Sequence, residues 1–373
     1  MSIPFIDLQA QRRRISSEVE KAVMAAVEGG QWIMGPQVRA LEERLAEYAG
    51  VRHCIACANG TDALMIVLRA WELGPGDAVF VPAFTFAASA EVVALMGAVP
   101  VFVDVFEDTY NLDPKSLEAA LEMVKREGKL KPRAIMPVDL FGQPADYSAI
   151  ELIAAREKLK LLVDTAQAFG ATLGGRQTAA IGDAAGTSFF PAKPLGCYGD
   201  GGATFTNDHA LAELLHSIRV HGQGADKYEN VRIGVNSRLD TIQAAILSEK
   251  LKIFPEEIEM RERVARRYTE AFRRSNRVRS PHVIDGAQST WAQYTIQVPD
   301  RDKLAADLKA KGIPTAVYYP TPLSHQKGYA HYPSVGTPVS DRIARHVISL
   351  PMHPYLDEAT HDRIIAAVLE SVV

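Results

Sequence analysis

The chain alternates between helical and strand-like hydrophobic patterns. Residues 38–49 carry apolar side chains at the spacing of one helical face, which predicts an amphipathic helix that ends at Gly50. Short runs such as 78–83 are apolar throughout, which is typical of buried strands. The expected strands are 53–58, 78–83, 99–105, 132–140, 159–164, 186–190 and 202–207. The expected helices between and after them are 63–71, 87–97, 113–128, 147–158 and 208–219. This alternation predicts an α/β fold, with a mostly parallel sheet covered by helices on both faces.

The pattern changes in the last third of the chain. A long helix is expected from Asp240 to about Arg274, interrupted at Pro255 because proline lacks the backbone N–H. Short strands and helices then mix, as in a smaller α+β unit. The expected strands there are 290–298, 314–320 and 346–352, and the expected helices are 302–312 and 357–373. We therefore predict a large domain over 1–250 and a small C-terminal domain over 251–373.

Composition narrows the class of protein. The chain has 373 residues, of which 47% are hydrophobic and 23% charged, and its net charge is −4. These values are typical of a globular protein of two domains and give no electrostatic reason to expect nucleic acid, although a small anion could still bind locally. The longest apolar region, residues 86–106, contains Glu91, Gly97, Pro100 and Asp104, so it is not expected to span a membrane.

Cysteine usage points to a reducing compartment. There are three cysteines, and the first residues lack the apolar segment of a signal peptide, so we expect the cytoplasm. Cys54 and Cys57 form a C-x-x-C pair, which could indicate redox chemistry or half a zinc site. No second pair and no H-E-x-x-H follow, so buried cysteines on a strand are the favoured interpretation and no metal is expected.

Polar residues follow two of the predicted strands, where open α/β sheets bind their ligands. The turn Asn59-Gly60-Thr61-Asp62 opens a helix, whose free N–H groups could bind an anion. The alternative is ordinary capping by Asn59 or Thr61. Asp164 ends an apolar strand, with Gln167 one turn further on. A carboxylate in that place needs a cationic partner, although it could equally cap a helix.

Lys193 is the one lysine between Lys160 and Lys227, and it follows the apolar strand 186–190. Burial would lower its pKa, and a neutral amine attacks carbonyl groups. Taken alone, a lysine reaching solvent from a loop is the commoner case. An anion site, a carboxylate and an amine at one sheet edge together match the phosphate, ring nitrogen and aldehyde of pyridoxal 5′-phosphate. Nucleotide motifs such as G-x-G-x-x-G after a first strand are missing, and His221 and His325 are expected in loops near the site.

Ten segments in order from residue 4 to 370 carry a resemblance to a known family. They include "ANGTDAL", "PAFTFAASA", "DTAQAFGA", "TSFFPAKPLGCYGDGG" and "GVNSRLDTIQAAIL". The chain resembles the DegT/StrS-type nucleotide-sugar aminotransferases, which use pyridoxal phosphate on the type I aspartate aminotransferase fold. Within the family it is most similar to enzymes that aminate a 3-oxo sugar such as UDP-2-acetamido-3-oxo-glucuronate, for bacterial surface polysaccharide.

The resemblance implies a role for each matched residue. Lys193 would form the Schiff base with the cofactor and then carry the proton, and Asp164 would keep the pyridine nitrogen protonated. Gln167 would lie by the phenolic oxygen, and Phe86 would stack on the ring. The phosphate would be bound by Gly60, Thr61, Ser188 and Asn236 of the partner subunit, so the resemblance implies a homodimer. The sugar nucleotide would be bound by Arg238, Tyr318 and Tyr319, and L-glutamate would donate the amine.

Other members of this fold leave alternatives for the reaction. Sugar dehydratases of the family replace the lysine by histidine, so Lys193 argues against that activity. A non-catalytic regulatory protein that keeps the pocket is a further alternative. The sugar itself stays open between a 3-oxo glucuronate, a UDP-3-oxo-N-acetylglucosamine for lipid A of lipopolysaccharide, and a dTDP-3-oxo-6-deoxyhexose. Where relatives often have His-Tyr-Pro, this chain has Tyr318-Tyr319-Pro320.

Overall fold

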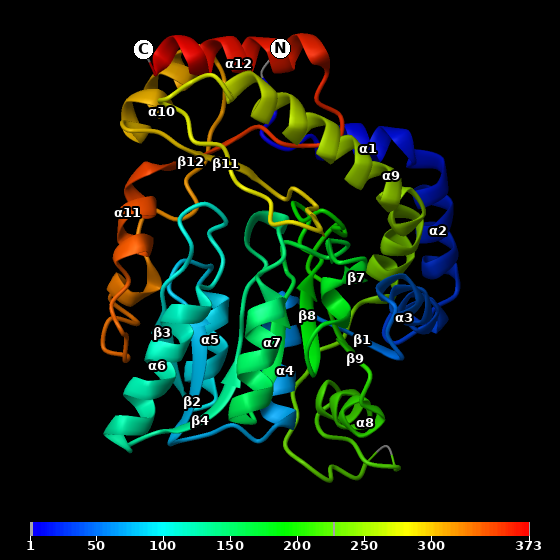
Figure 1. Ribbon diagram of the computed structural model, residues 1–373. Helices are drawn as coiled ribbons and strands as arrows, with labels where there is room; N and C mark the ends of the chain where they lie inside the picture. Colours follow the sequence, from blue (N-terminus) through cyan, green and yellow to red (C-terminus); the bar gives the residue numbers. More distant parts are fainter. Residues whose placement is uncertain (1–2, 227, 373) are drawn as a thin grey trace.

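A seven-stranded sheet forms the centre of the computed structural model, which describes residues 3–226 and 228–372 (Figure 1). Its strand order is β1-β9-β8-β5-β4-β2-β3. Four of the six neighbouring pairs are parallel, and β9 runs antiparallel to both of its neighbours. The strands are β1 (His53–Cys57), β2 (Asp77–Pro82), β3 (Val99–Val103), β4 (Lys131–Ile135), β5 (Lys160–Asp164), β8 (Ala184–Ser188) and β9 (Gly202–Thr206). The predicted α/β fold with a mostly parallel sheet is confirmed.

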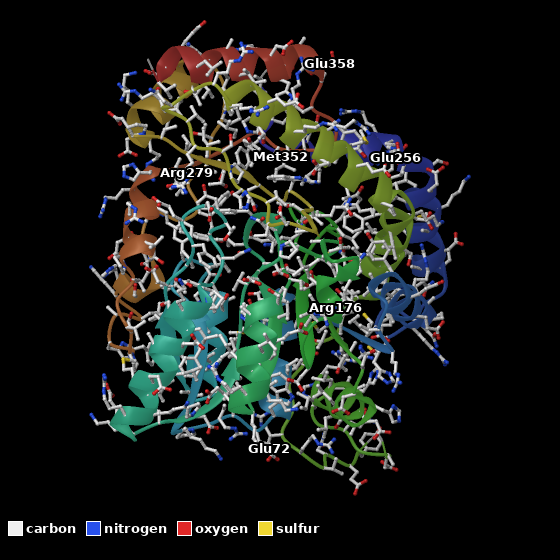
Figure 2. The ribbon with its side chains drawn as sticks, viewed as in Figure 1. Glu72, Arg176, Glu256, Arg279, Met352 and Glu358 are labelled. Carbon is white, nitrogen blue, oxygen red and sulfur yellow. The ribbon has the colours of Figure 1, made fainter. Side chains whose placement is uncertain are left out.

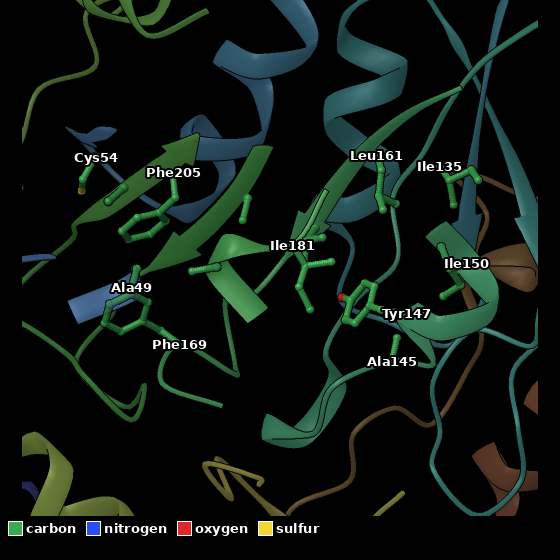
Figure 3. Packing of buried hydrophobic residues seen from close by; sticks show 14 of the residues in the cluster. Ala49, Cys54, Ile135, Ala145, Tyr147, Ile150, Leu161, Phe169, Ile181 and Phe205 are labelled. Atoms are coloured by element: carbon green, nitrogen blue, oxygen red, sulfur yellow. The ribbon is translucent and has the colours of Figure 1, made fainter. Parts of the chain in front are cut away.

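Helices cover both faces of this sheet. They are α3 (Pro36–Ala49), α4 (Gly60–Ala70), α5 (Ala88–Leu95), α6 (Pro114–Glu127), α7 (Tyr147–Glu157), α8 (His209–Ile218) and α9 (Thr241–Phe272). Side chains of α3, α6, α7 and α9 share one buried cluster with one face of the strands, part of which Figure 3 shows. Side chains of α4, α5 and α8 form the cluster on the other face. The short predicted strands are apolar throughout because both of their faces are buried.

The two cysteines of β1 illustrate this two-sided burial. Cys54 belongs to the cluster with α3, whereas Cys57 belongs to the cluster with α4, because residues three apart in a strand point to opposite faces. Both are free and buried, and burial raises the pKa of Cys57 to about 12. The interpretation as buried strand cysteines is confirmed, and a thiol with so high a pKa is a poor nucleophile.

The long helix α9 runs from Thr241 to Phe272 without a break, so the predicted interruption at Pro255 is wrong. Proline removes one hydrogen bond, but its fixed φ is compatible with a helix. Leu251, Phe254 and Ile258 on either side of it are buried in the core, and this packing holds both halves of the helix in line. Residue 250, where a domain boundary was predicted, lies inside α9, and the division into two domains stays a prediction.

The C-terminal half of α9 and the elements after it, apart from α11, form a separate core above the large sheet in Figure 1. Strands β11 (Tyr294–Gln297) and β12 (Val347–Leu350) pair antiparallel and are shorter than predicted. The expected strand over 314–320 is wrong, since Ala316 alone pairs there, with Ser349, and prolines at both ends of the segment cannot donate to a ladder. The helices are α10 (Arg301–Ala310), α11 (Pro338–His346) and α12 (Glu358–Ser371); Val373, the last residue of the helix expected there, lies outside the described residues.

Two helices at the start of the chain were not predicted. Helices α1 (Leu8–Arg14) and α2 (Ser16–Glu28) lie along α9, where Ile15 and Val19 pack against Ile246. Arg14 pairs with Glu256, which Figure 2 marks on α9 beside them. A small three-stranded sheet has the strand order β10 (Ala287–Gln288), β6 (Thr172–Leu173), β7 (Arg176–Gln177). Within the described residues, no helix combines the length and hydrophobicity needed to cross a membrane.

Candidate active site

A cavity of about 440 Å³ opens at the carboxyl ends of β1, β5 and β8. Parallel strands end at the same edge of a sheet, so residues from distant parts of the sequence meet there. Gly60, Thr61, Phe86, Asp164, Gln167, Ser188, Lys193, Tyr318 and Tyr319 all line this cavity. The structure therefore brings together nine of the eleven residues that the sequence indicated for cofactor and substrate.

The start of α4 forms one end of the cavity. The Asn59 side chain caps this helix by accepting from the N–H of Asp62 at 2.8 Å, so ordinary capping is present as well. A Cβ built on Gly60 would lie 2.5 Å from Cβ of Ser188, so the absence of a side chain lets the helix approach β8. The first N–H groups of the helix and the Ser188 hydroxyl thus face one small space, which suits a phosphate group.

Asp164 is 5% exposed at the end of β5, and both of its oxygens are engaged. Oδ1 accepts from the N–H of Ala166 at 3.1 Å, and Oδ2 accepts from the Ser89 hydroxyl at 3.0 Å. Burial raises the pKa of Asp164, while these two hydrogen bonds and the charge of Lys193 act in the opposite direction. A cationic N–H in the cavity would further stabilise the ionised carboxylate.

Lys193 lies in the loop between β8 and β9, with its side chain toward the same cavity. Its backbone N–H donates to the carbonyl of Phe190 at 2.9 Å, which fixes the turn that presents the side chain. Burial lowers the pKa of Lys193, and Asp164 opposes this shift. The amine is thereby biased toward the neutral, nucleophilic form.

Gln167 and two aromatic side chains shape the wall beside Asp164. Gln167 accepts from the N–H of Phe141 at 2.7 Å and donates to the hydroxyl of Tyr319 at 3.3 Å. The ring of Phe86 lies 6.4 Å from that of Tyr319 and is 58% exposed, although it borders the cavity. An exposed aromatic face in that place suits a flat ring as ligand.

The remaining candidates do not line the cavity of this chain. Asn236 is exposed and Arg238 half-buried, on either side of the buried Ser237, which accepts from the N–H of Ala58 at 3.2 Å. His325 pairs with Asp341 at 2.7 Å instead, and His221 lies outside the cavity too. Neither histidine therefore lines the cavity, and their expected place in loops near the site stays a prediction.

Sequence reasoning missed several residues of the site. Ser89 contacts Asp164 directly, and Thr85 lies 3.2 Å from the Ser89 hydroxyl. Both belong to the segment "FTFAAS", but nothing in the spacing of that segment indicates a contact with a residue 75 positions away. The cavity is also lined by Asn59, Phe190, Asp200 and Gln293.

The donor set fits pyridoxal 5′-phosphate. Gly60 and Ser188 lie side by side at one end of the cavity and form a cradle that could take a phosphate, while Asp164 and Lys193 offer a carboxylate for a ring nitrogen and an amine for an aldehyde. Phe86 and Ala166 line the same cavity as apolar surface for the ring. The arrangement can therefore hold all three reactive parts of that cofactor at once.

Comparison with known proteins agrees with this geometry. Residues 13–369 match the DegT/DnrJ/EryC1/StrS aminotransferase family. A UDP-2-acetamido-2-deoxy-3-oxo-D-glucuronate aminotransferase of Pseudomonas aeruginosa is 48% identical, over 98% of this chain and 99% of that protein. A pleiotropic regulatory protein of Geobacillus stearothermophilus is 41% identical, over 99% of this chain and 98% of that protein. The crystal structure of a DegT DnrJ EryC1 StrS aminotransferase from Brucella abortus superposes with a TM-score of 0.97 at 52% identity, over 99% of both chains.

Proposed function

The chain belongs to the DegT/DnrJ/EryC1/StrS aminotransferase family, and from this premise we propose that it transfers the amino group of L-glutamate to a 3-oxo nucleotide sugar. UDP-2-acetamido-2-deoxy-3-oxo-glucuronate is the first candidate acceptor, because a relative of that activity shares 48% of its residues over nearly the whole chain. The observation that carries the proposal is that Lys193 and Asp164 line the same cavity, each largely buried and close enough for its charge to affect the pKa of the other. The product would serve surface polysaccharide or lipopolysaccharide synthesis.

Pyridoxal 5′-phosphate is the cofactor of this enzyme class. When bound, it supplies an electron sink for the electron pair left on the donor carbon after a proton is removed. Gly60, Thr61 and Ser188 would hold its phosphate, Phe86 would cover its ring, and Gln167 would lie near its phenolic oxygen. Asp164 would accept the ring N–H, with Ser89 and the N–H of Ala166 fixing the direction of the carboxylate.

Lys193 would act as both the attachment point and the proton carrier. Its Nζ, whose pKa burial lowers, would remove the proton from Cα of glutamate and deliver a proton within the same cavity. The second half of the reaction would run the same proton transfer in reverse on the keto sugar. Tyr318 and Tyr319, which line the cavity, would bind the sugar nucleotide.

A homodimer with shared active sites follows from the same proposal. Asn236 is exposed and outside the cavity of its own chain, so its phosphate-binding role requires the cavity of a second copy. Three exposed apolar residues lie near the start of α9: Trp32, Ile33 and Tyr198. The backbone carbonyl of Trp32 accepts from the N–H of Thr241, and the side chain of Gln243 accepts from the N–H of Tyr198. Such a surface suits a second copy of the chain. Arg238, two residues from Asn236, would reach the same partner site and meet the uronate carboxylate or the diphosphate.

Complementation between inactive variants tests the shared site. Lys193→Ala and Asn236→Ala chains are each expected to be impaired as homodimers, whereas mixing them leaves one intact site in each mixed dimer. Random exchange should restore about a quarter of the wild-type activity, since half of the dimers are mixed. Activity no higher than the average of the two variants would contradict the shared site.

The sugar is tested by an acceptor panel. Purified protein with L-glutamate and each of three acceptors, the 3-oxo glucuronate, UDP-3-oxo-N-acetylglucosamine and a dTDP-3-oxo-6-deoxyhexose, is assayed for 2-oxoglutarate. We expect the uronate to give the highest kcat/KM. Equal rates with neutral and uronate sugars would remove the reason for preferring the uronate.

A regulatory protein is the second candidate, because a relative named as a pleiotropic regulatory protein is 41% identical. Such a protein would bind the cofactor without turnover, so the 2-oxoglutarate assay separates the two functions. The free and buried state of all three cysteines suits the reducing cytoplasm that we propose for either.

A further inference from the structure

Lys250 is a buried lysine that the proposed reaction does not use. It lies on α9 and is 1% exposed. Its Nζ donates to the carbonyl of Gly196 at 2.6 Å and lies 4.3 Å from the centre of the Tyr198 ring. Both contacts are with the loop that carries Lys193.

That loop is also held by contacts of its own: Phe189 and Cys197 are buried in the core, and the N–H of Cys197 donates to the carbonyl of Phe189 at 2.8 Å. Residues 189–201, all described by the structure, connect β8 to β9 without forming a helix or strand. Gly196 is buried, and a Cβ on it would lie 2.5 Å from the carbonyl oxygen of Phe190, so the loop folds tightly back on itself there.

Helix α9 holds the loop at two neighbouring points. Gln243 exchanges hydrogen bonds with the backbone of Tyr198, at 2.9 Å and 3.4 Å, and Lys250 lies two turns further along the same face. Burial lowers the pKa of Lys250 to about 8, and the charge of Glu257, a further two turns along the helix, opposes this shift. The protonated form of Lys250 is thus stabilised by the Gly196 carbonyl, the Tyr198 ring and the charge of Glu257.

We propose that Lys250 is a positioning residue for the reaction: by fixing Gly196, it holds the loop so that the Lys193 amine points into the cavity. This inference rests on the proposed function, because it assigns Lys193 the chemistry described above. Lys250 touches no reacting atom, so it acts through the loop alone.

The test compares Lys250→Met with Lys252→Met in the cofactor-loaded enzyme. Lys252 lies one half-turn away, is exposed and pairs with Glu249, so its variant controls for the loss of a lysine from α9. In Lys250→Met we expect amide hydrogen exchange in the peptide covering residues 190–200 to accelerate at least about tenfold, with peptides of β5 unchanged. We also expect kcat to fall about tenfold or more while the KM for glutamate changes less than about threefold, and Lys250→Arg to recover part of kcat.

Each outcome decides the proposal. If the amide exchange rate of residues 190–200 and the kcat of Lys250→Met both lie within about twofold of the Lys252→Met values, the positioning role is overturned. Faster exchange in all peptides would also overturn it, because Lys250 would then support the fold in general. A wild-type protein that loads no cofactor and forms no 2-oxoglutarate would count against the proposed function instead, since the exchange comparison does not depend on turnover.

Discussion

The hydroxyl of Ser89 donates to Oδ2 of Asp164 over 3.0 Å, and this bond joins the start of α5 to the end of β5. The bond lowers the pKa of Asp164 against the larger effect of burial, which raises it. Ser89 thus helps to keep the carboxylate ionised, and an ionised carboxylate is what a protonated ring nitrogen requires.

Replacing Ser89 by Ala is expected to weaken catalysis at low pH. Without the hydroxyl, the pKa of Asp164 rises, so the carboxylate takes up a proton at a higher pH than in the wild type. The acid limb of the profile of kcat against pH should shift to higher pH. Below neutral pH, kcat should fall about tenfold, which corresponds to the free energy of one hydrogen bond to a charged group. Ser89→Thr, which keeps the hydroxyl, is the control; coincident profiles for Ala and wild type would refute the role.

Removing the lysine amine should abolish colour and turnover together. Lys193→Ala is expected to lose the visible absorbance of the lysine-bound cofactor and about 10³-fold or more of kcat, since the proton carrier is gone. Lys129→Ala, at an exposed position after α6, should keep both. A yellow, fully active Lys193→Ala protein would rule out the assignment.

The contact between Gly60 and Ser188 predicts a position that tolerates no side chain. Gly60→Ala should force α4 and β8 apart and weaken cofactor binding by at least about tenfold, because a Cβ would fall inside the contact distance of Ser188. Gly74→Ala offers the matched control, since a Cβ there meets nothing within 4 Å. Equal dissociation constants for the two variants, measured by titrating cofactor into the stripped proteins, would show that the cradle is not needed.

Asp139 makes the fold sensitive to pH. It is fully buried, its Oδ2 has no partner among the described residues, and burial raises its pKa to about 7. Because the folded-state pKa lies above the unfolded value, the folded protein binds more protons between about pH 4 and 7, and stability falls as pH rises through this window. Asp139→Asn keeps an acceptor for Tyr147 and should remove this loss.

Chemical denaturation at two pH values checks this prediction. At pH 8, Asp139→Asn should exceed the wild type in unfolding free energy by on the order of 1 to 4 kcal/mol, and the difference should disappear near pH 4. A variant less stable than the wild type at pH 8 would mean that the ionised carboxylate stabilises the fold.

The sequence predicted the site well where parallel strands end. Gly60, Asp164 and Lys193 follow or end separate strands, and the rule that such ends share one edge was sufficient to bring them together, whereas Ser188 came only from the family resemblance. Ser89 could not be predicted, because its contact with Asp164 depends on how α5 lies against the sheet. Asn236 and Arg238 lie outside the cavity of one chain, so a single chain does not assemble the complete predicted set.

The errors in the fold have local causes. The break predicted at Pro255 follows from the hydrogen bond that proline removes from a helix. The packing of Phe254 and Ile258 on either side outweighs that one lost hydrogen bond, and the helix continues. The segment 314–320 has strand-forming residues, but strand formation also needs a partner, and only Ala316 finds one. Helices α1 and α2 are stabilised by α9, a contact that local sequence does not reveal.

The cradle between Gly60 and Ser188 also sets an order of events during synthesis of the protein. The two residues come from distant parts of the chain, so the cradle exists only after β8 has joined the sheet beside α4. An unfolded chain offers the cofactor no phosphate site, so cofactor binding shifts the folding equilibrium toward the folded state. Cofactor binding would in this way raise the free energy of unfolding as well as supply the chemistry.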